Sequence, residues 1–578
     1  MRSLFAPIAC LGLLLGPGCD PPPQHGTIDA VPPPPIDAGP PEADAGNRSG
    51  VGSLELVVTD DETGLTLPSR VLITAVPPTP PIRFDVNARG MVLNGETAAS
   101  VAPGVMGAPE GVMLYSGAGS MRIPAGTYEL FITHGPEWEA DTRKVTIGPR
   151  DTIRIESALR HSVDTAGWLA ADLHVHTARS YDSQLQLDAR VISEVAVGVQ
   201  LIVTTDHNIV TDLQPLIEVL GYRDVARAIV GDEFNFFEGH GGAYPMMYDA
   251  RNPDAGITKF QLDWDTVRLI HGPDMFDYLH KLPSSPAVTI NHPRLLPDLG
   301  YFINLRWSPP EPLLGAGKFD ALEVLNGYLQ APEDARALMR DWFFLLTSGY
   351  KVTALGSSDT HRLRDVKAGF PRTWLRLPTD DVTRVLDSEL GDAIKHQRAI
   401  ASTGPFATLT VDGAKIGEQV TNPTGTVIIE ATVDAPAWID VDKIRLYVNG
   451  KLVEERSVAP GLRPLFHAKW PQALPPGDCW VVLQASGSKP LPVGLIGDHE
   501  AGRVMPFVIT SPVFVDGDGD HKWKPMLADP RDADPGPLGP VTGPSPGDAL
   551  ELLPPQSQPA PEDCEPPLWT NPSTWVNP

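Results

Sequence analysis

The chain contains few cysteines and few basic residues. Only 4 of its 578 residues are cysteine, and 45 lysines and arginines stand against 72 aspartates and glutamates, which gives a formal net charge of −27. Such an acidic surface repels phosphate backbones, and no basic run interrupts it, so nucleic-acid binding is not expected. No cysteine lies near the clustered histidines described below, which excludes thiolate metal ligands there.

The N-terminal apolar run is too short for a membrane-spanning helix, which needs about 20 apolar residues. It extends from Leu4 to Leu15, follows Arg2 and ends in "GPGC", a pattern typical of a signal peptide over residues 1–18. Cys19 after a small residue resembles a bacterial lipobox, although Gly16 replaces the usual leucine. We therefore expect an exported protein, lipid-anchored through Cys19 to a bacterial envelope membrane, with plain secretion as the alternative.

Cys479 and Cys564 are the two cysteines that remain beyond this N-terminal region. In an exported protein, two such residues favour a disulfide over two free thiols.

The length predicts three or four domains at about 150 residues each. Residues 19–50 are proline-rich and predict an extended tether, and residues 516–578 predict a Pro/Gly/Asp-rich tail. Short alternating runs such as "SRVLITAV" predict a β-sandwich over residues 51–160, where "IPAGTYELFI" resembles carboxypeptidase-regulatory-like modules. Similar runs, with a hairpin signal at Asn449-Gly450, predict a second sandwich over residues 406–515.

Residues 165–405 have a different pattern. Runs of four to six apolar residues alternate with helical stretches, including a possible helix over 211–220 and one that begins at Pro332 and ends at Gly349. This alternation is typical of buried parallel strands, whose natural closed form is a β/α barrel. The fold class is therefore multidomain α/β plus all-β, with a central barrel between two β-sandwiches.

Metal-binding residue types follow the apolar runs of this central region. His174 and His176 are two apart, so they project from the same face of a strand. Asp182 and His240 are expected on loops that leave two of these strands. The C-terminal ends of parallel barrel strands meet at one rim, so we expect these side chains to gather there. The residues are His174 and His176 in "DLHVH", Asp182, His207 in "TTDHN", Glu233 in "GDEF", His240, His292 in "NHPR", and Asp359 and His361 in "SSDTH".

Imidazoles and carboxylates without thiolates suit Zn, Mn or Fe. Nine ligands exceed the needs of one tetrahedral ion and suit two or three divalent ions that share a carboxylate. Paired metals activate hydroxide and polarise a scissile group, so the pattern predicts a hydrolase.

The motifs "DLHVHTARSYDS", "TTDHN", "GDEF", "NHPR" and "GSSDTHR" resemble the PHP (polymerase and histidinol phosphatase) superfamily. That resemblance implies a distorted (β/α)7 barrel over about 240 residues. It also implies three metal positions: one held by His174, His176, Glu233 and Asp359; a second by Glu233, His240 and His292; and a third by Asp182, His207 and His361. "DALEVLNGYL" and "IASTGPFATLTVDG" are similar to its CehA/McbA-type branch, which implies an ester or carbamate hydrolase.

The substrate is a separate question. Glu233 and Asp359 are expected to act in catalysis through the metals, and Arg294 and Arg362, next to ligands, to bind an anionic substrate bidentately. That favours a phosphoester, with a neutral carboxylic ester or carbamate as the alternative. A different class, a non-catalytic surface-binding or scaffold lipoprotein, is disfavoured because an idle rim has no need for nine polar groups.

Three lesser signals stay open. Asn208 and Asn326 also follow strand ends, where capping or turn formation competes with a role at the site. Asp516, Asp518 and Asp520 have the spacing of a calcium loop, but Leu527 stands where an EF-hand needs glutamate, so a polar turn is favoured over calcium binding.

Overall fold

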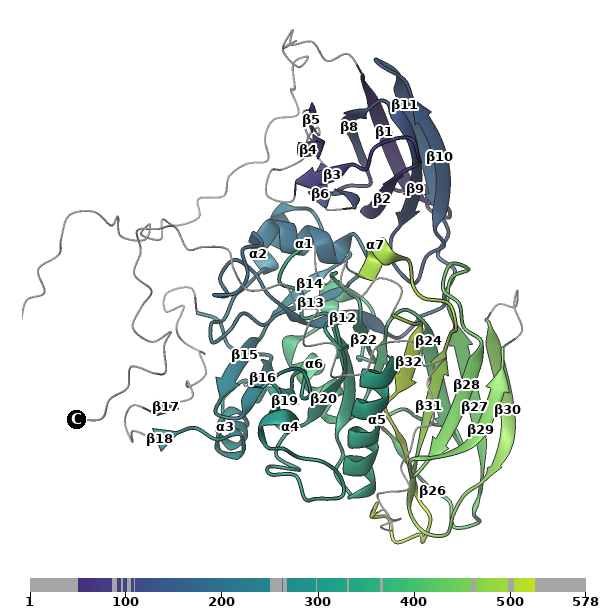
Figure 1. Cartoon of the computed structure of the whole chain (residues 1–578). Coiled ribbons are helices and arrows are strands. Elements are labelled where there is room, and N and C mark those ends of the chain that lie inside the picture. Colours follow the sequence, from purple (N-terminus) through teal and green to yellow (C-terminus); the bar gives the residue numbers. More distant parts are fainter. Residues whose placement is uncertain are drawn as a thin grey trace, which may run out of the picture. The chain divides into compact units, whose positions relative to one another are not determined.

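The computed structural model shows a multidomain, strand-rich mixed α/β protein (Figure 1). The described residues all belong to one compact unit, 47–578. The predicted signal peptide, tether and Cys19, together with Cys564 and the chain beyond 524, lie outside them. Among the described residues, no helix is both long and apolar enough to span a bilayer. The described residues are 50–85, 91–94, 97–100, 105–108, 110–249, 262–263, 268–297, 299–329, 332–363, 367–458, 464–496 and 504–524.

The N-terminal region forms two main sheets, of orders β11-β1-β8 and β10-β9-β2-β7-β6, and a small third sheet, β3-β4-β5. Alternating burial along β1, β9 and β11 places one face of each strand in a shared apolar core, as a half-buried strand requires. The strands are β1 Val51–Asp60, β2 Ser69–Ala75, β3 Arg83–Asp85, β4 Met91–Asn94, β5 Thr97–Ser100, β6 Val105–Ala108, β7 Gly111–Leu114, β8 Ala118–Pro124, β9 Gly126–Thr133, β10 Asp141–Ile147 and β11 Thr152–Leu159.

The central strands belong to two sheets rather than one. β14-β13-β12-β22-β23 form part of a large sheet, and β15-β16-β19-β20-β21 form a second. The strands, with a separate β17-β18 pair, are β12 Leu169–Val175, β13 Leu201–Thr204, β14 Arg227–Val230, β15 Asp232–Phe236, β16 Gly239–Tyr244, β17 Leu262–Asp263, β18 Arg268–Leu269, β19 Ala287–Ile290, β20 Ala321–Asn326, β21 Thr353–Ser357, β22 Arg372–Leu375 and β23 Ala399–Ser402.

The expected all-parallel arrangement is only partly present. β12, β13 and β14 are parallel, as are β19, β20 and β21. β16 pairs antiparallel with both β15 and β19, and β22 pairs antiparallel with both β12 and β23. The connection between β15 and β16 is too short for a crossover helix, so β16 reverses direction, whereas β22 and β23 are antiparallel although α6 lies between them. Within the described residues the ladders do not close a barrel, and the ends of the two central sheets are joined by isolated β-bridges, Val175 with Thr360 and His207 with Glu233.

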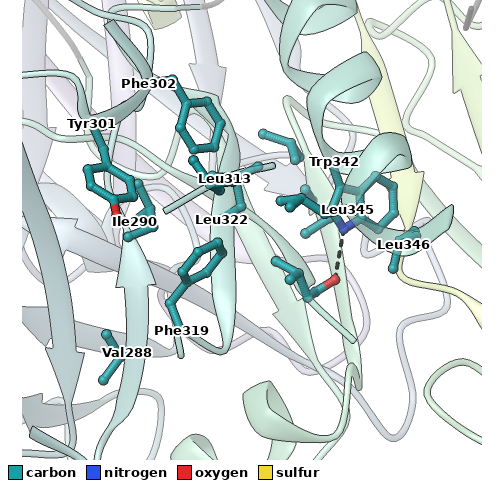
Figure 2. Close-up of a cluster of buried hydrophobic side chains, with 14 of the residues drawn as sticks. Val288, Ile290, Tyr301, Phe302, Leu313, Phe319, Leu322, Trp342, Leu345 and Leu346 are labelled. Carbon is teal, nitrogen blue, oxygen red and sulfur yellow. Dashed lines mark hydrogen bonds between the residues drawn. The ribbon is translucent and has the colours of Figure 1, made fainter. Parts of the chain in front are cut away.

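Helices α2, α4, α5 and α6 pack against strands of the central sheets, and α5 is the longest helix of those described. It begins at Pro332, as predicted, and packs Trp342, Leu345 and Leu346 against the apolar cluster of Figure 2. The Trp342 indole N–H donates to the Val352 carbonyl at 2.7 Å, so this buried ring leaves no polar atom unpaired. The possible helix over 211–220 is shorter than expected. The helices are α1 Leu187–Val195, α2 Gln214–Val219, α3 Gly272–Leu279, α4 Tyr301–Asn304, α5 Pro332–Thr347, α6 Asp387–Lys395 and α7 Val493–Ile496.

The C-terminal strands continue a central sheet, which the sequence did not indicate. β23 pairs with β32, so one 11-stranded sheet spans both regions, and β25-β24-β27-β30 form a separate sheet. The predicted hairpin at Asn449-Gly450 is confirmed, since both residues have positive φ, 48° and 76°. The strands are β24 Phe406–Val411, β25 Ala414–Lys415, β26 Gln419–Thr421, β27 Thr426–Asp434, β28 Lys443–Val448, β29 Lys451–Ser457, β30 Phe466–Ala473, β31 Cys479–Ser486, β32 Phe507–Thr510 and β33 Val513–Asp516.

Cys479 lies in β31 with its side chain fully buried, and it forms no disulfide within the described residues. Burial, together with Asp478, raises the pKa of its thiol to about 12. The predicted partner, Cys564, is outside the described residues, so the disulfide stays a prediction. Packing extends past residue 515: the Trp523 indole N–H donates to the Cys479 carbonyl at 2.9 Å.

Candidate metal centre

Glu233, at the start of β15, lies in the middle of the clustered histidines. Its Oε2 lies 3.0, 3.2 and 3.1 Å from Nε2 of His174, His176 and His207. Its Oε1 lies 3.0 Å from His292 Nε2 and 3.4 Å from His240 Nδ1. The two oxygens therefore face different histidines, so the carboxylate could contribute to more than one cation site.

Three overlapping groups have ligand atoms within 4.8 Å of one another. The first coincides with the first metal position implied by the PHP resemblance. The second adds His176 to the implied third position. The third contains His207 with Glu233 and His240; His292 is not in this group, although it contacts Glu233. The groups are His174, His176, Glu233 and Asp359; His176, Asp182, His207 and His361; and His207, Glu233 and His240.

Three of the atoms that would bind a metal are buried without a hydrogen-bond partner. This holds for Nε2 of His174, Nε2 of His176 and Oδ1 of Asp359. Buried polar atoms are normally paired, so these three atoms are suited to bind a cation. Nitrogen and oxygen donors of this kind suit Zn, Mn or Fe, and the residues therefore fit divalent ions.

The electrostatics of the metal-free centre also favour cations. Burial lowers the pKa of His174 and His176, but the carboxylates of Asp359 and Glu233 outweigh it, and the pKa of His176 rises to about 9. Burial raises the pKa of Glu233 and Asp359, but the surrounding histidines outweigh it and hold both well below the usual range. At neutral pH the carboxylates are therefore charged, and protons occupy histidine nitrogens that a metal would take.

His240 is an exception, and its position corrects the sequence interpretation. It lies within strand β16, not on a loop: it pairs with Asn235 of β15, and from Gly241 onward β16 also pairs with β19. Burial lowers its pKa to about 4, so its ring is neutral and can bind a metal at neutral pH. Flanking glycines at 239, 241 and 242 gave the segment its loop-like composition.

Two proposed ligands have a left-handed backbone: Asp359 has φ of 57° and His292 has φ of 25°. Residues other than glycine adopt this conformation at a cost, and such residues cluster at functional sites. Arg190 of α1 stabilises the chain next to Asp359, because its buried guanidinium donates to the carbonyls of His176 and Thr360 at 3.0 and 2.6 Å. It thereby ties the chain after β12 to the chain after β21.

The asparagines that sequence reasoning left open lie at the centre. Asn326 donates to Asp359 Oδ2 at 3.2 Å, and Asn208 donates to Asn235 Oδ1 at 2.8 Å. Asn235 Oδ1 also lies 3.1 Å from His207 Nδ1. These amides therefore position ligands.

Glu323 is the residue that sequence reasoning missed. It is buried within β20, and its carboxylate contacts both His174 and the backbone of His292. The run "DALEVLN" predicted the strand, and an acid inside an apolar run was the signal that could have identified it.

The two arginines differ in their surroundings. Arg294 donates to both carboxylate oxygens of buried Asp341 and lies 5.6 and 5.9 Å from the rings of Phe302 and Trp307. Its fork is therefore already occupied by a carboxylate of the protein. Arg362 is exposed and follows His361 directly.

A further acidic group lies in the C-terminal region and contains Asp478, Asp516 and Asp518, but not Asp520. Asp516 accepts from the backbone N–H of Gly519 and His521, and Asp478 accepts from those of Gly517 and Lys524. These bonds are what a polar turn requires.

No family model matches the chain, and no curated protein matches it. Among solved structures, an Endonuclease Q complex with a 27-mer duplex containing an abasic lesion is similar at 14% identity and a TM-score of 0.25. The similarity covers 39% of this chain, which spans a little over half, 56%, of that protein. A Parabacteroides merdae β-glucuronidase is similar at 10% identity, with 77% of this chain and 59% of that chain covered and a TM-score of 0.16. Similarities this weak carry no argument about fold or activity.

Proposed function

We propose that the protein is a metal-dependent hydrolase of the PHP type. The observation that carries the proposal is the position of Glu233, whose two carboxylate oxygens each face a different set of buried histidines. Buried Nε2 atoms without partners support it further. A scaffold protein would have no reason to bury these groups unpaired, because each costs about 1–3 kcal/mol.

The residues have distinct roles in this proposal. His174, His176, Glu233 and Asp359 would hold one divalent ion, Glu233 with His240 and His292 a second, and Asp182, His207 and His361 a third. Zn, Mn or Fe held there would supply Lewis-acid activation of water and of the scissile bond. Glu233 would contribute to two of these metal positions, and Asn326 orients Asp359 by a hydrogen bond.

Substrate approaches from the more accessible side of the centre. The side chains of Asp182 and His361 are 29% and 16% exposed, whereas those of His174, His176 and Glu233 are buried. The ring of Tyr181, which is 69% exposed, stacks on His207 with centroids 4.8 Å apart. Tyr181 therefore belongs to the mouth of the proposed active site.

The distorted (β/α)7 barrel is part of the same proposal. Parallel pairing of β12 with β13 and of β20 with β21 supports it. The isolated bridges from Val175 to Thr360 and from His207 to Glu233 lie where the ends of the two central sheets meet. In this proposal the barrel would close at these bridges, one of which joins two proposed ligands, His207 and Glu233.

A phosphoester is the first candidate substrate, and exposed Arg362 beside His361 is the residue that favours it. A neutral carboxylic ester or carbamate is the second candidate. Arg294 donates to Asp341 and so is not available as one of the two predicted anion-binding groups, which favours a neutral substrate.

The proposal is tested by metal analysis and paired assays. Protein purified from metal-replete medium is expected to contain at least two equivalents of Zn, Mn or Fe, and to lose hydrolysis after chelation and regain it on reconstitution. If the protein is purified without metal and takes up none of these ions, the hydrolase proposal is wrong and the scaffold interpretation is favoured.

Substrate class is tested on an aryl phosphoester and an uncharged aryl ester. Arg362→Met is expected to weaken phosphoester binding and to leave the neutral ester unchanged. Arg294→Met is the matched control, which should lower stability without changing selectivity, because its partner is Asp341. If the native protein prefers the neutral ester, and Arg362→Met does not change phosphoester hydrolysis, a neutral ester or carbamate becomes the first candidate substrate.

A further inference from the structure

The carboxylate of Glu323 lies directly behind the proposed ligands, and it is 1% exposed. Its Oε1 lies 2.9 Å from His174 Nδ1. Its Oε2 accepts from the backbone N–H of His292 at 2.7 Å and from the amide of Asn326 at 2.9 Å. One buried carboxylate thus contacts proposed ligands that follow or belong to different strands.

The bonding capacities of these partners restrict His174. A backbone N–H and an amide NH₂ can only donate, and an ionised carboxylate can only accept, whereas a neutral imidazole nitrogen does either according to tautomer. Glu323 therefore requires the proton on Nδ1 of His174. In the neutral ring that a metal would bind, the lone pair is then on Nε2, the atom that lies 3.0 Å from Glu233 Oε2 and 3.3 Å from Asp359 Oδ1.

We propose that Glu323 is a positioning residue that fixes the tautomer of His174, so that Nε2 is the atom offered to the first metal ion. This rests on the proposed function, since it takes the cluster to be a metal centre. The same carboxylate holds the backbone of His292, at φ of 25°, and through Asn326 it orients Asp359. Glu323 thereby links ligands of two metal positions.

Glu323→Gln is an informative variant because it keeps the size and changes one acceptor into a donor. The new NH₂ must face either His174 or the pair formed by His292 N–H and Asn326 NH₂. Only the histidine can become an acceptor, so the amide turns towards it. His174 then carries its proton on Nε2 and cannot bind the metal there.

Glu323→Ala removes the acceptor without replacing it by a donor. Water in the space left can accept from Nδ1 of His174. The alanine variant should therefore bind metal better than the glutamine variant, although its larger cavity makes it less stable. Glu323→Asp keeps an acceptor-only group and should bind metal better than either.

The experiment titrates Zn²⁺ alone into metal-free protein against a competing chelator, and measures the metal-free Tm of each variant. Glu323→Gln is expected to weaken Zn²⁺ binding about 10–100-fold, the usual effect of losing such a partner, with alanine intermediate and aspartate nearest to native. The Tm should follow a different order, with glutamine above alanine. Asp434→Asn, which alters a buried carboxylate that accepts the Ala435 and Leu465 N–H groups, is the control and should leave Zn²⁺ affinity unchanged.

Native-like Zn²⁺ affinity in the glutamine variant would overturn the role, as would affinities that follow the Tm order. If the glutamine variant does not fold, the other two variants test the proposal. Equal Zn²⁺ affinities of Glu323→Ala and Glu323→Asp would contradict it. A native chain that binds no Zn²⁺ overturns the proposed function and this role together. Zn²⁺ binding by the native chain with an unaffected glutamine variant overturns the role alone.

Discussion

At the scale of single residues, charge and geometry converge on Glu233. Its two oxygens lie within 3.4 Å of five histidine nitrogens, and the surrounding imidazoles hold its pKa well below the usual range. A buried carboxylate among so many nitrogens is stable in the metal-free state only because some of these nitrogens are protonated. Metal ions would replace those protons, which leads to two predictions.

Glu233→Gln keeps the side-chain size and removes the charge shared between the proposed metal positions. We expect the loss of at least one metal equivalent and of nearly all hydrolysis, with the fold retained, because the side chain still fills its space. Metal analysis, activity and circular dichroism of the purified variant measure these effects. Full activity with full metal content would contradict the bridging role.

Metal binding is predicted to release protons. The pKa of His176 is about 9 in the metal-free centre, so the ring is protonated at pH 7 and must lose a proton to bind through Nε2. Apparent Zn²⁺ affinity should therefore increase as the pH is raised to about 9, and it should be weaker at lower pH. Calorimetry at pH 7 in buffers of different ionisation enthalpy would detect the release, and a binding enthalpy independent of the buffer would refute it.

At the scale of elements, β16 shows how packing decides between strand and loop. The segment "GHGGAY" has the composition of a loop, yet it pairs on both sides and its residues are buried. Gly241 explains the composition: a Cβ there would lie 2.5 Å from Phe234 Cζ and 2.7 Å from the Thr289 carbonyl oxygen. Glycine is needed for this close approach, and strand pairing places His240 at the centre.

Gly241→Ala is expected to destabilise the protein by about 1–3 kcal/mol, because a backbone oxygen cannot move aside as a side chain can. The displaced strand should also lower metal occupancy through His240. Thermal unfolding and metal analysis measure both effects. Gly391→Ala in α6 is the control: its nearest atom would lie 3.1 Å away and helix propensity favours alanine, so a smaller change is expected. Equal effects in the two variants would show that the β16 contact is unimportant.

At the scale of the whole molecule, one 11-stranded sheet joins the central region to the C-terminal region through β23 and β32. The proposed catalytic region therefore shares hydrogen bonds and core with the following domain, and the domain boundaries read from composition stay predictions. The proposed lipid anchor on Cys19, and the export that it implies, belong to the same scale.

Cys19→Ser is predicted to change where the protein partitions. The native protein should enter the detergent phase when expressed in a bacterium that processes lipoproteins, because acyl chains on Cys19 anchor it. The variant should enter the aqueous phase or remain unprocessed. If the native protein and the variant both enter the aqueous phase, Cys19 carries no lipid anchor and plain secretion is the better interpretation.

The sequence by itself determined which residue types follow the apolar runs, because strand periodicity and run endings are local properties. It thereby predicted that polar side chains gather at one site, the start of α5 at Pro332 and the hairpin at Asn449-Gly450; the group of His174, His176, Glu233 and Asp359 was implied by the PHP resemblance. It also predicted a strand at "DALEVLN", but not the role of its acid.

Only the tertiary structure decided what each polar group meets. Asp341 occupies the fork of Arg294 from 47 residues away, and Glu323 reaches His174 across 149 residues of chain. It also set the direction of β16 and the continuity of the large sheet. Donors and acceptors brought together by folding have no fixed spacing in the chain, so their partners follow from the packing of whole strands and helices and not from any local pattern.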